Sequence, residues 1–208
     1  MAITKISPSV VDFDAGITIT VDDNSDTLTL TSTDADANAG PYLNLYRNSS
    51  SPADSDQAGQ ITFTGRNDNS QDVDYARIIT QIKDASDSSE DGRLAINTMV
   101  GGSIYSRMNI VEGETVFNDE SIDVDFRVES DNNTHMLYVD GSADKIGIDT
   151  NAPLVKLDIN DNTIRVRTAG TPSSASDFGA QGEIRWDADY IYVCVATDTW
   201  KRVAISTW

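Results

Sequence analysis

The sequence has few of the residues from which most catalytic and zinc sites are built. Its 208 residues include one histidine, His135, and one cysteine, Cys194. One cysteine excludes an intrachain disulfide, and a zinc site needs several histidine or cysteine ligands. The same scarcity argues against a nucleophile–base pair, and no Gly-x-Ser-x-Gly elbow occurs. We therefore predict a protein that is not an enzyme, with His135 as a strand side chain, Cys194 as a buried small hydrophobe, and no cofactor or metal.

Basic residues and long apolar runs are also scarce. The chain has 15 lysine and arginine residues against 34 aspartate and glutamate residues, which gives a net charge of -19. Nucleic acids and anionic membrane surfaces repel such a chain, so neither is an expected partner. No stretch approaches the roughly 18–20 apolar residues of a membrane span, and residues 1–8 lack the hydrophobic core of a signal peptide. We expect a protein that is made in a cytoplasm and is not inserted into a membrane.

Two acidic runs begin in the way that calcium-binding loops do. Asp34–Asn38 and Asp158–Asn162 present oxygen-bearing side chains in alternation, and oxygen ligands are what Ca²⁺ takes. Ala39 and Thr163 then stand where such a loop needs its glycine, and neither run has the closing glutamate. Ordinary polar turns account for both runs.

Alternation of apolar and polar residues is the dominant pattern. Ile17–Val21 and Thr27–Thr31 place apolar side chains on one face and mainly threonine on the other, which favours half-buried strands. Asp22–Asp26 between them is typical of a turn, so the pair predicts a hairpin. The further candidate strands are Tyr42–Tyr46, Ile61–Thr64, Ala76–Ile82, Leu94–Asn97, Ile104–Ile110, Ile122–Val128, His135–Val139, Lys145–Ile148, Leu154–Ile159, Thr163–Thr168, Glu183–Trp186, Tyr190–Val195 and Thr199–Ser206.

Short strands at this spacing predict an all-β fold made of β-sandwich or β-solenoid segments, with a small C-terminal β-domain. Only 38% of the residues are hydrophobic, below the usual share of about 45–50%. A single copy has little apolar surface with which to cover its own sheets, so we expect identical chains to complete them. Polar stretches at residues 48–60 and 168–182 are predicted loops or linkers. The predicted divisions are an N-terminal segment (1–16), an N-terminal β-domain (17–115), a second β-region (116–170) and a C-terminal β-domain (171–208).

Part of the chain resembles phage tail-fibre proteins. Asp125–Ser130, His135–Gly141 and Lys145–Pro153, followed by Lys156–Ile159, match a pattern common in that family. Asp149 stands where the pattern usually carries glycine, so we expect the backbone to turn differently there. The final stretch, Gly182–Asp187, Tyr190–Cys194 and Trp200–Val203, is similar to end domains of structural proteins from marine phages.

The resemblance implies an intertwined homotrimer that forms a fibre or fibre-like appendage of a virion. Its implied partners are identical chains, other virion proteins of tail or capsid, and a host surface glycan. The N-terminal segment would anchor the appendage through Ile3, Ile6, Val10, Val11 and Phe13. Three alternatives stay open. One is a capsid decoration protein, that is, a head fibre or cement protein. A second is a polysaccharide depolymerase, whose catalysis needs a pair of carboxylates. The third is a free carbohydrate-binding module, which would be monomeric.

Four aromatic residues near the C-terminus have two interpretations. Trp186, Tyr190, Tyr192 and Trp200 are concentrated in the last predicted domain. Large aromatic side chains in a small β-domain commonly form its core. Their faces can also stack on sugars, so the same residues are candidates for contact with a host glycan.

Overall fold

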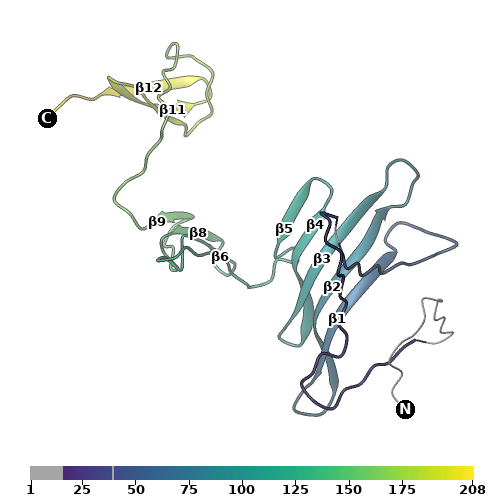
Figure 1. Ribbon diagram of the computed structural model, residues 1–208. Coiled ribbons are helices and arrows are strands. Elements are labelled where there is room, and N and C mark those ends of the chain that lie inside the picture. The colour runs from purple at the N-terminus through teal and green to yellow at the C-terminus, as the bar shows by residue number, and fades with distance from the viewer. Residues whose placement is uncertain (1–15, 39) are drawn as a thin grey trace, which may run out of the picture. The chain divides into compact units, whose positions relative to one another are not determined.

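The computed structural model describes residues 16–38 and 40–208, and this part of the chain is all β (Figure 1). The strands form three sheets. The chain divides into two compact units, residues 1–120 and 121–208. Within the described residues, no helix is long and apolar enough to cross a membrane. The all-β prediction is confirmed. The finer division into four predicted segments, and the trimer, stay predictions.

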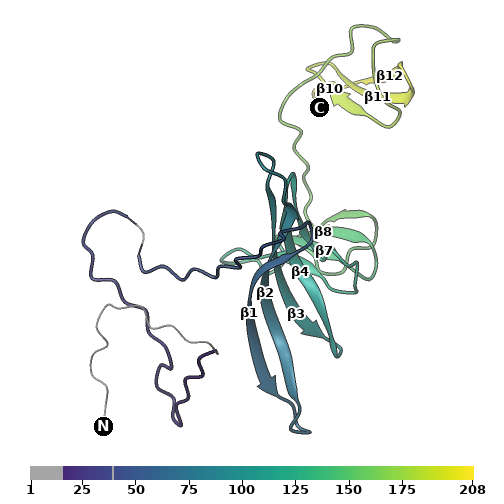
Figure 2. The same cartoon turned by 90° about the vertical axis from the view of Figure 1, so that its right-hand side faces the viewer.

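The first unit contains a five-stranded antiparallel sheet in which each strand pairs with the next (Figures 1 and 2). Gly101 and Gly102, both with positive φ, join the third and fourth strands, as a two-residue hairpin of the type I′ kind requires. An extended segment precedes the sheet, and its Leu45 lies against Gly59. The strands are β1 (Gln57–Arg66), β2 (Asp72–Asp84), β3 (Asp91–Val100), β4 (Ser103–Val111) and β5 (Glu114–Phe117).

One face of this sheet carries a row of large apolar side chains, one from each strand. Directly paired residues of antiparallel strands project to the same face, and the pairings run from β1 to β5 without a break. We call these residues the apolar row: Ile61, Ile78, Ile96, Met108 and Phe117. Ile61 and Ile96 are each 39% exposed and Phe117 is 49% exposed. The apolar row is therefore only partly covered within one chain.

The opposite face of the sheet is closed by polar contacts. Ala95 and Asn109 pair across β3 and β4 and are both buried. Arg93 Nε donates to Asn109 Oδ1 at 2.6 Å, and Asn109 Nδ2 donates to Asp119 Oδ2 at 2.9 Å. Glu120 Oε2 accepts a hydrogen bond from the backbone N–H of Ser106 at 3.2 Å. The residues after β5 thus cap part of this face and provide partners for Asn109 and for the Ser106 N–H.

The second unit contains a four-stranded sheet and a three-stranded sheet. The four strands are β6 (Phe126–Val128), β7 (Leu137–Asp140), β8 (Lys145–Ile148) and β9 (Leu157–Ile159), and only the β8–β9 pair is parallel. The three antiparallel strands are β10 (Ile184–Trp186), β11 (Tyr190–Ala196) and β12 (Thr199–Ala204).

Asp149 follows β8 with a φ of 59°. This is the left-handed conformation that glycine adopts freely and aspartate tolerates better than most residues. The Asp149 N–H donates to His135 O at 2.9 Å, and Asn133 Nδ2 donates to its carboxylate. Asp149 therefore occupies a backbone conformation open to glycine, and the replacement by itself demands no different turn.

Four sequence predictions of strands are wrong for the single chain. The segments Ile17–Val21, Thr27–Thr31, Tyr42–Tyr46 and Thr163–Thr168 form no strand. Ile122–Val128 is strand only over its last three residues, and the short strand β5 lies where a domain boundary was expected. A strand needs a neighbour with which to exchange backbone hydrogen bonds, and within residues 16–38 and 40–208 these four segments pair with no strand. Their apolar side chains stay exposed, for example Ile17 and Leu28.

Candidate functional site

The three-stranded sheet gathers three of the four aromatic residues singled out in the sequence. Tyr192 and Trp200 are buried with Cys194 and form a small core, against which Tyr190 packs. Trp186 pairs with Ile191 and so belongs to the other face of the sheet. Its Nε1 donates to Val166 O at 3.0 Å. The structure thus separates Trp186 from the aromatic core.

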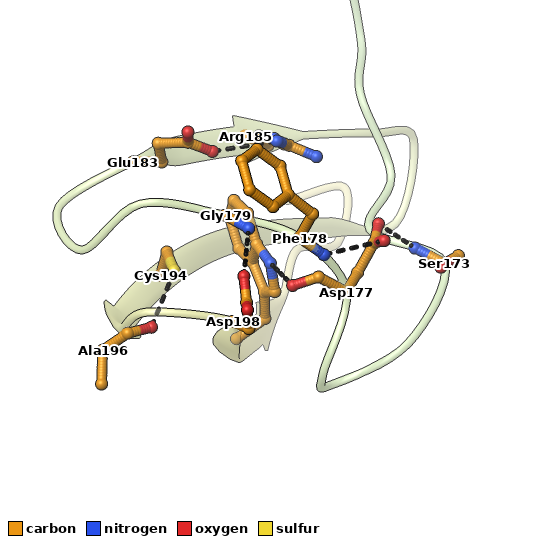
Figure 3. Close-up of polar contacts among 10 residues, drawn as sticks. Ser173, Asp177, Phe178, Gly179, Glu183, Arg185, Cys194, Ala196 and Asp198 are labelled. Atoms are coloured by element: carbon orange, nitrogen blue, oxygen red, sulfur yellow. Dashed lines mark hydrogen bonds and ion pairs between the residues drawn. The ribbon is translucent and has the colours of Figure 1, made fainter.

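The loop before β10 folds over Trp200 and belongs to this domain. Figure 3 shows Ser173, Asp177, Phe178 and Gly179 of this loop, with the hydrogen bond from the Gly179 N–H to Asp198. Trp200 Nε1 donates to Asp177 O at 3.1 Å, and the Trp200 backbone N–H donates to Ala175 O at 2.9 Å. A Cβ on Gly179 would lie 2.5 Å from Trp200 Cζ2. Only glycine therefore allows the backbone of the loop to lie so close to the indole. The stretch 168–182, predicted as a loop or linker, is a loop, and it forms a lid on the core.

Two arginines lie over aromatic rings of the same cluster. The Arg185 guanidinium is 4.5 Å from the centre of the Trp200 ring, and its Nη2 pairs with Glu183 Oε2 at 2.9 Å. The Arg202 guanidinium is 4.1 Å from the centre of the Tyr190 ring. Such contacts each contribute roughly 0.5–1 kcal/mol at exposed sites, and they restrict where the two cations point.

Asp187 connects the lid, the β10–β11 turn and the aromatic core. Its Oδ2 accepts hydrogen bonds from the hydroxyls of Tyr192 at 2.7 Å and Thr171 at 2.8 Å. Its Oδ1 accepts from the backbone N–H groups of Asp189 and Tyr190. These hydrogen bonds lower the pKa of Asp187 to about 2, and the bond from the Tyr192 hydroxyl makes the largest contribution. The same bond raises the pKa of Tyr192.

This network makes the stability of the domain depend on pH. The folded-state pKa of Asp187 is depressed, so its contribution is present above the ordinary aspartate pKa of 3.8 and is lost as the pH falls toward about 2. We expect Asp187→Asn to lower Tm at pH 7, and the difference from the parent protein to shrink between about pH 4 and pH 2. Thermal unfolding at a series of pH values measures this. Asp189→Asn, an exposed carboxylate two residues away, is the matched control and should change little; a difference that persists at pH 2 contradicts the assignment.

A pocket of about 300 Å³ lies between the lid and β12. Residues 172–175 line one side, and Tyr192 with residues 200–202 lines the other. Its wall includes the cations Lys201 and Arg202, and no carboxylate. Two larger grooves are open. One, of about 630 Å³ in the first unit, has Leu94, Ile110, Asp91 and Glu112 in its wall. The other, of about 640 Å³, lies beside Ile184 and Ile191.

The remaining candidate residues are placed as follows. Ile3, Ile6, Val10, Val11 and Phe13, the predicted anchor, lie outside the described residues. Cys194 is buried, as predicted. His135 lies just before β7, where its Nδ1 is 2.8 Å from the Thr134 hydroxyl and its ring meets Tyr138 edge-on. In the part of the chain that the structure describes, no group of three or more histidine, cysteine or acidic residues is arranged to hold a metal.

No protein-family model matches the chain. Short stretches are similar to two phage proteins. Over 41 residues, 20% of the chain, it is 54% identical to a capsule K30/K69-specific depolymerase of Klebsiella phage K5-2. Over 64 residues, 23% of the chain, it is 36% identical to a depolymerase with the same capsule specificity from Klebsiella phage K64-1. The matches cover 5% and 8% of those proteins. The chain is thus partly similar to phage capsule depolymerases.

Proposed function

We propose that the chain is a structural part of a phage appendage, in which three identical chains complete one another's sheets. The exposed apolar row across β1–β5 carries this proposal. A sheet with an apolar face is stable only when a second layer covers that face. In the described residues of the first unit, no second sheet or helix does so. The similarity to phage depolymerases supports the phage assignment, and the resemblance to tail fibres supports the number three.

The small number of buried residues leads to the same proposal. In residues 16–38 and 40–208, the buried hydrophobic residues are Ile79, Ala95, Tyr192, Cys194 and Trp200. Burial of apolar surface contributes about 25 cal/mol per Å² and must offset about 1–2 kcal/mol of backbone entropy per ordered residue. Five buried hydrophobic side chains among the described residues offset little of that entropy. Contacts between copies supply the missing burial.

The extended segments before β1 have the pattern of strands that pair between chains. Ile17, Ile19, Leu28 and Leu30 alternate with polar residues and are exposed. β1 is an edge strand of the described sheet, with β2 paired on one side. Unpaired edges attract further strands. In an intertwined trimer, neighbouring chains would provide partners for both, and the net charge of -19 would keep finished trimers apart.

The mass of the native protein tests the proposal. We expect light scattering to give three times the 22.6 kDa of the chain, and the trimer to resist warm detergent. A well-folded monomer would contradict it. Cryo-electron microscopy of the particle, with this chain located, separates a tail appendage from the capsid decoration alternative. The same images show whether residues 1–16 meet another virion protein and whether the C-terminal domain faces the host.

The similarity to depolymerases also favours a second candidate, that the chain contributes to cleavage of a capsule polysaccharide. Glycoside hydrolysis uses two carboxylates on either side of the scissile bond. Asp91 and Glu112 both line one groove in the first unit, so this candidate is tested on that pair. Release of reducing ends from capsule by the purified trimer, and its loss in Asp91→Asn and Glu112→Gln, would establish the enzyme. We propose instead that the chain has no catalytic activity.

A further inference from the structure

A groove of about 630 Å³ extends the exposed apolar face of the five-stranded sheet. Thr80, Leu94 and Ile110 line this groove, and they pair with one another across β2, β3 and β4. Each lies two residues from a member of the apolar row, and residues two apart on a strand share a face. The groove and the apolar row are therefore one continuous surface. In the described part of the first unit, no strand or helix forms a second layer over it.

The chain itself leads onto the edge of this surface. A Cβ on Gly59 would lie 3.2 Å from Leu45 Cβ and 3.7 Å from Thr80 Oγ1. Gly59 pairs with Thr80, so Leu45 lies on the face that carries the groove. The segment before β1 therefore covers this face only at the β1 edge, while Ile96 on the middle strand stays 39% exposed.

Residues 17–31, which we call the arm, have the pattern of a second layer. The apolar residues of the arm are all exposed, and they are Ile17, Ile19, Val21, Leu28 and Leu30. Pairing of Val21 with Leu28 would place all five on one face of a hairpin, because residues paired across antiparallel strands share a face. A two-stranded hairpin alone is at best marginally stable in water. This explains why the arm pairs with no strand in the described part of the single chain.

The arm fits the exposed face in spacing and in polarity. Alternate residues of a strand stand about 6.6–6.8 Å apart, so the apolar residues of the arm recur at the interval that separates Leu94 from Ile96 on β3. The other stripe of the two alternating segments consists of threonine alone. A layer with one face on a core and one face in water shows this division.

We propose that the arm of each copy forms a hairpin on the groove and apolar row of a neighbouring copy. The inference rests on the proposed function and names the residues that cover the exposed face. Leu30 lies 15 residues before Leu45, and a chain of this length spans up to about 50 Å. The arm is thus within reach of its own sheet, yet it stays exposed in the single chain, which favours the neighbour. Contacts in which each copy gives one arm and receives another can close into a ring.

Hydrogen exchange of the native full chain tests the proposal without any substitution. We expect the amides of Ile17–Val21 and Thr27–Thr31 to exchange at least about tenfold more slowly than those of a synthetic peptide of residues 16–32, because a seated hairpin must open before it exchanges. Exchange of the whole arm at the rate of the peptide overturns the proposal.

Substitutions on the two stripes of the arm test which side chains make the contact. Ile19→Asp places a carboxylate on the apolar stripe and should raise the concentration at which half of the trimer dissociates at least about tenfold, because the carboxylate would be buried without a partner. Thr18→Asp adds the same charge to the other stripe and should change that concentration by no more than about twofold. Ile19 is 52% exposed in the single chain, so its fold should persist. Equal effects of the two substitutions overturn the proposal.

Cross-linking identifies the copy that receives the arm. Chains with Leu30→Cys and differently tagged chains with Leu94→Cys are expressed together and treated with a short bismaleimide; Cys194 is buried. We expect covalent pairs that carry both tags. Gln60→Cys in place of Leu94→Cys puts the thiol on the opposite face of the sheet and should give far fewer pairs. A link that forms only when both cysteines are in one chain overturns the proposal, because the arm then covers its own sheet.

The native mass separates this inference from the proposed function. A trimer in light scattering whose arms exchange freely refutes the placement of the arm alone. A monomer refutes the proposed function, and this inference with it.

Discussion

In an Ile96→Lys variant, we expect the trimer to dissociate into folded single chains. Ile96 lies on the middle strand β3, at the centre of the apolar row. If copies pack on this face, the substitution buries an ammonium group without a partner in every chain. Such burial costs several kcal/mol per charge, and three copies suffer it together. Light scattering should therefore report a fall from three times 22.6 kDa to one.

The fold of the single chain should survive this substitution. Ile96 is 39% exposed within one chain, so its removal leaves no large cavity there, and the β signal in circular dichroism should persist. Ile61→Lys lies at one end of the apolar row, on edge strand β1, and should likewise lower the measured mass from that of a trimer to that of a single chain. Gln60→Lys introduces the same side chain on the opposite face of β1 and should leave the trimer intact. Trimers of unchanged mass and Tm in both isoleucine variants would mean that the apolar row is not the interface.

Local alternation was sufficient to locate most of the strands. The predicted Lys145–Ile148 coincides with β8, and the predictions near Ala76 and Ile104 fall inside β2 and β4. In these segments, apolar residues recur at every second position, and the partner strand follows after a short turn. Pattern and pairing are then both local, which is why a single sequence reveals them.

Apolar–polar alternation gave wrong or incomplete predictions where the partner strand is distant in sequence or lies outside the described residues. Ile17–Val21 alternates as clearly as β2 does, yet it pairs with no strand of the described part of the chain and forms no strand itself. Alternation tells which side chains share a face, but it does not tell what that face will meet. The parallel pairing of β8 with β9 likewise depends on how the chain crosses between them, which no local pattern indicates.

The candidate site was predictable in its composition but only partly in its geometry. Tyr190, Tyr192 and Trp200 cluster as their concentration in the sequence indicated, while Trp186 falls on the other face because it pairs with Ile191. The glycine, proline and serine residues of the lid predicted a loop or linker, but they did not indicate that the loop lies over Trp200. The requirement for glycine at position 179 is evident only from the structure, in which Trp200 lies against it.

Asp187 was overlooked among 34 acidic residues. Nothing in its own position distinguishes its carboxylate from those of its neighbours. Its role comes from Thr171 and Tyr192, sixteen residues before it and five after it. The turn signal Asp187-Ala188-Asp189 followed by Tyr190 was visible and marks the β10–β11 hairpin. Which carboxylate would bind the Tyr192 hydroxyl became clear only from the register of β10 and β11.

Trp200→Ala should unfold the C-terminal domain while leaving the first unit intact. Trp200 is 6% exposed and is one of three residues in the core of the β10–β12 sheet. Its indole contacts Gly179 and Arg185 and bonds to Asp177 O. Truncation of a buried tryptophan costs about 3–5 kcal/mol, and it removes the largest side chain from a core of three buried residues. Hydrogen exchange should show loss of protection in β10–β12 and unchanged protection in β1–β4.

Trp208→Ala is the matched control, because it removes the same side chain from a fully exposed position. Its effect should stay within about 0.5 kcal/mol. Gly179→Ala tests the same contact from the side of the lid, since its methyl group would collide with the indole, and it should loosen the lid without removing the ring. If Trp200→Ala kept full protection in β10–β12, the lid and strands would be held by the Asp187 network alone. The aromatic cluster would then not be required for the stability of the domain and would be available to bind a ligand.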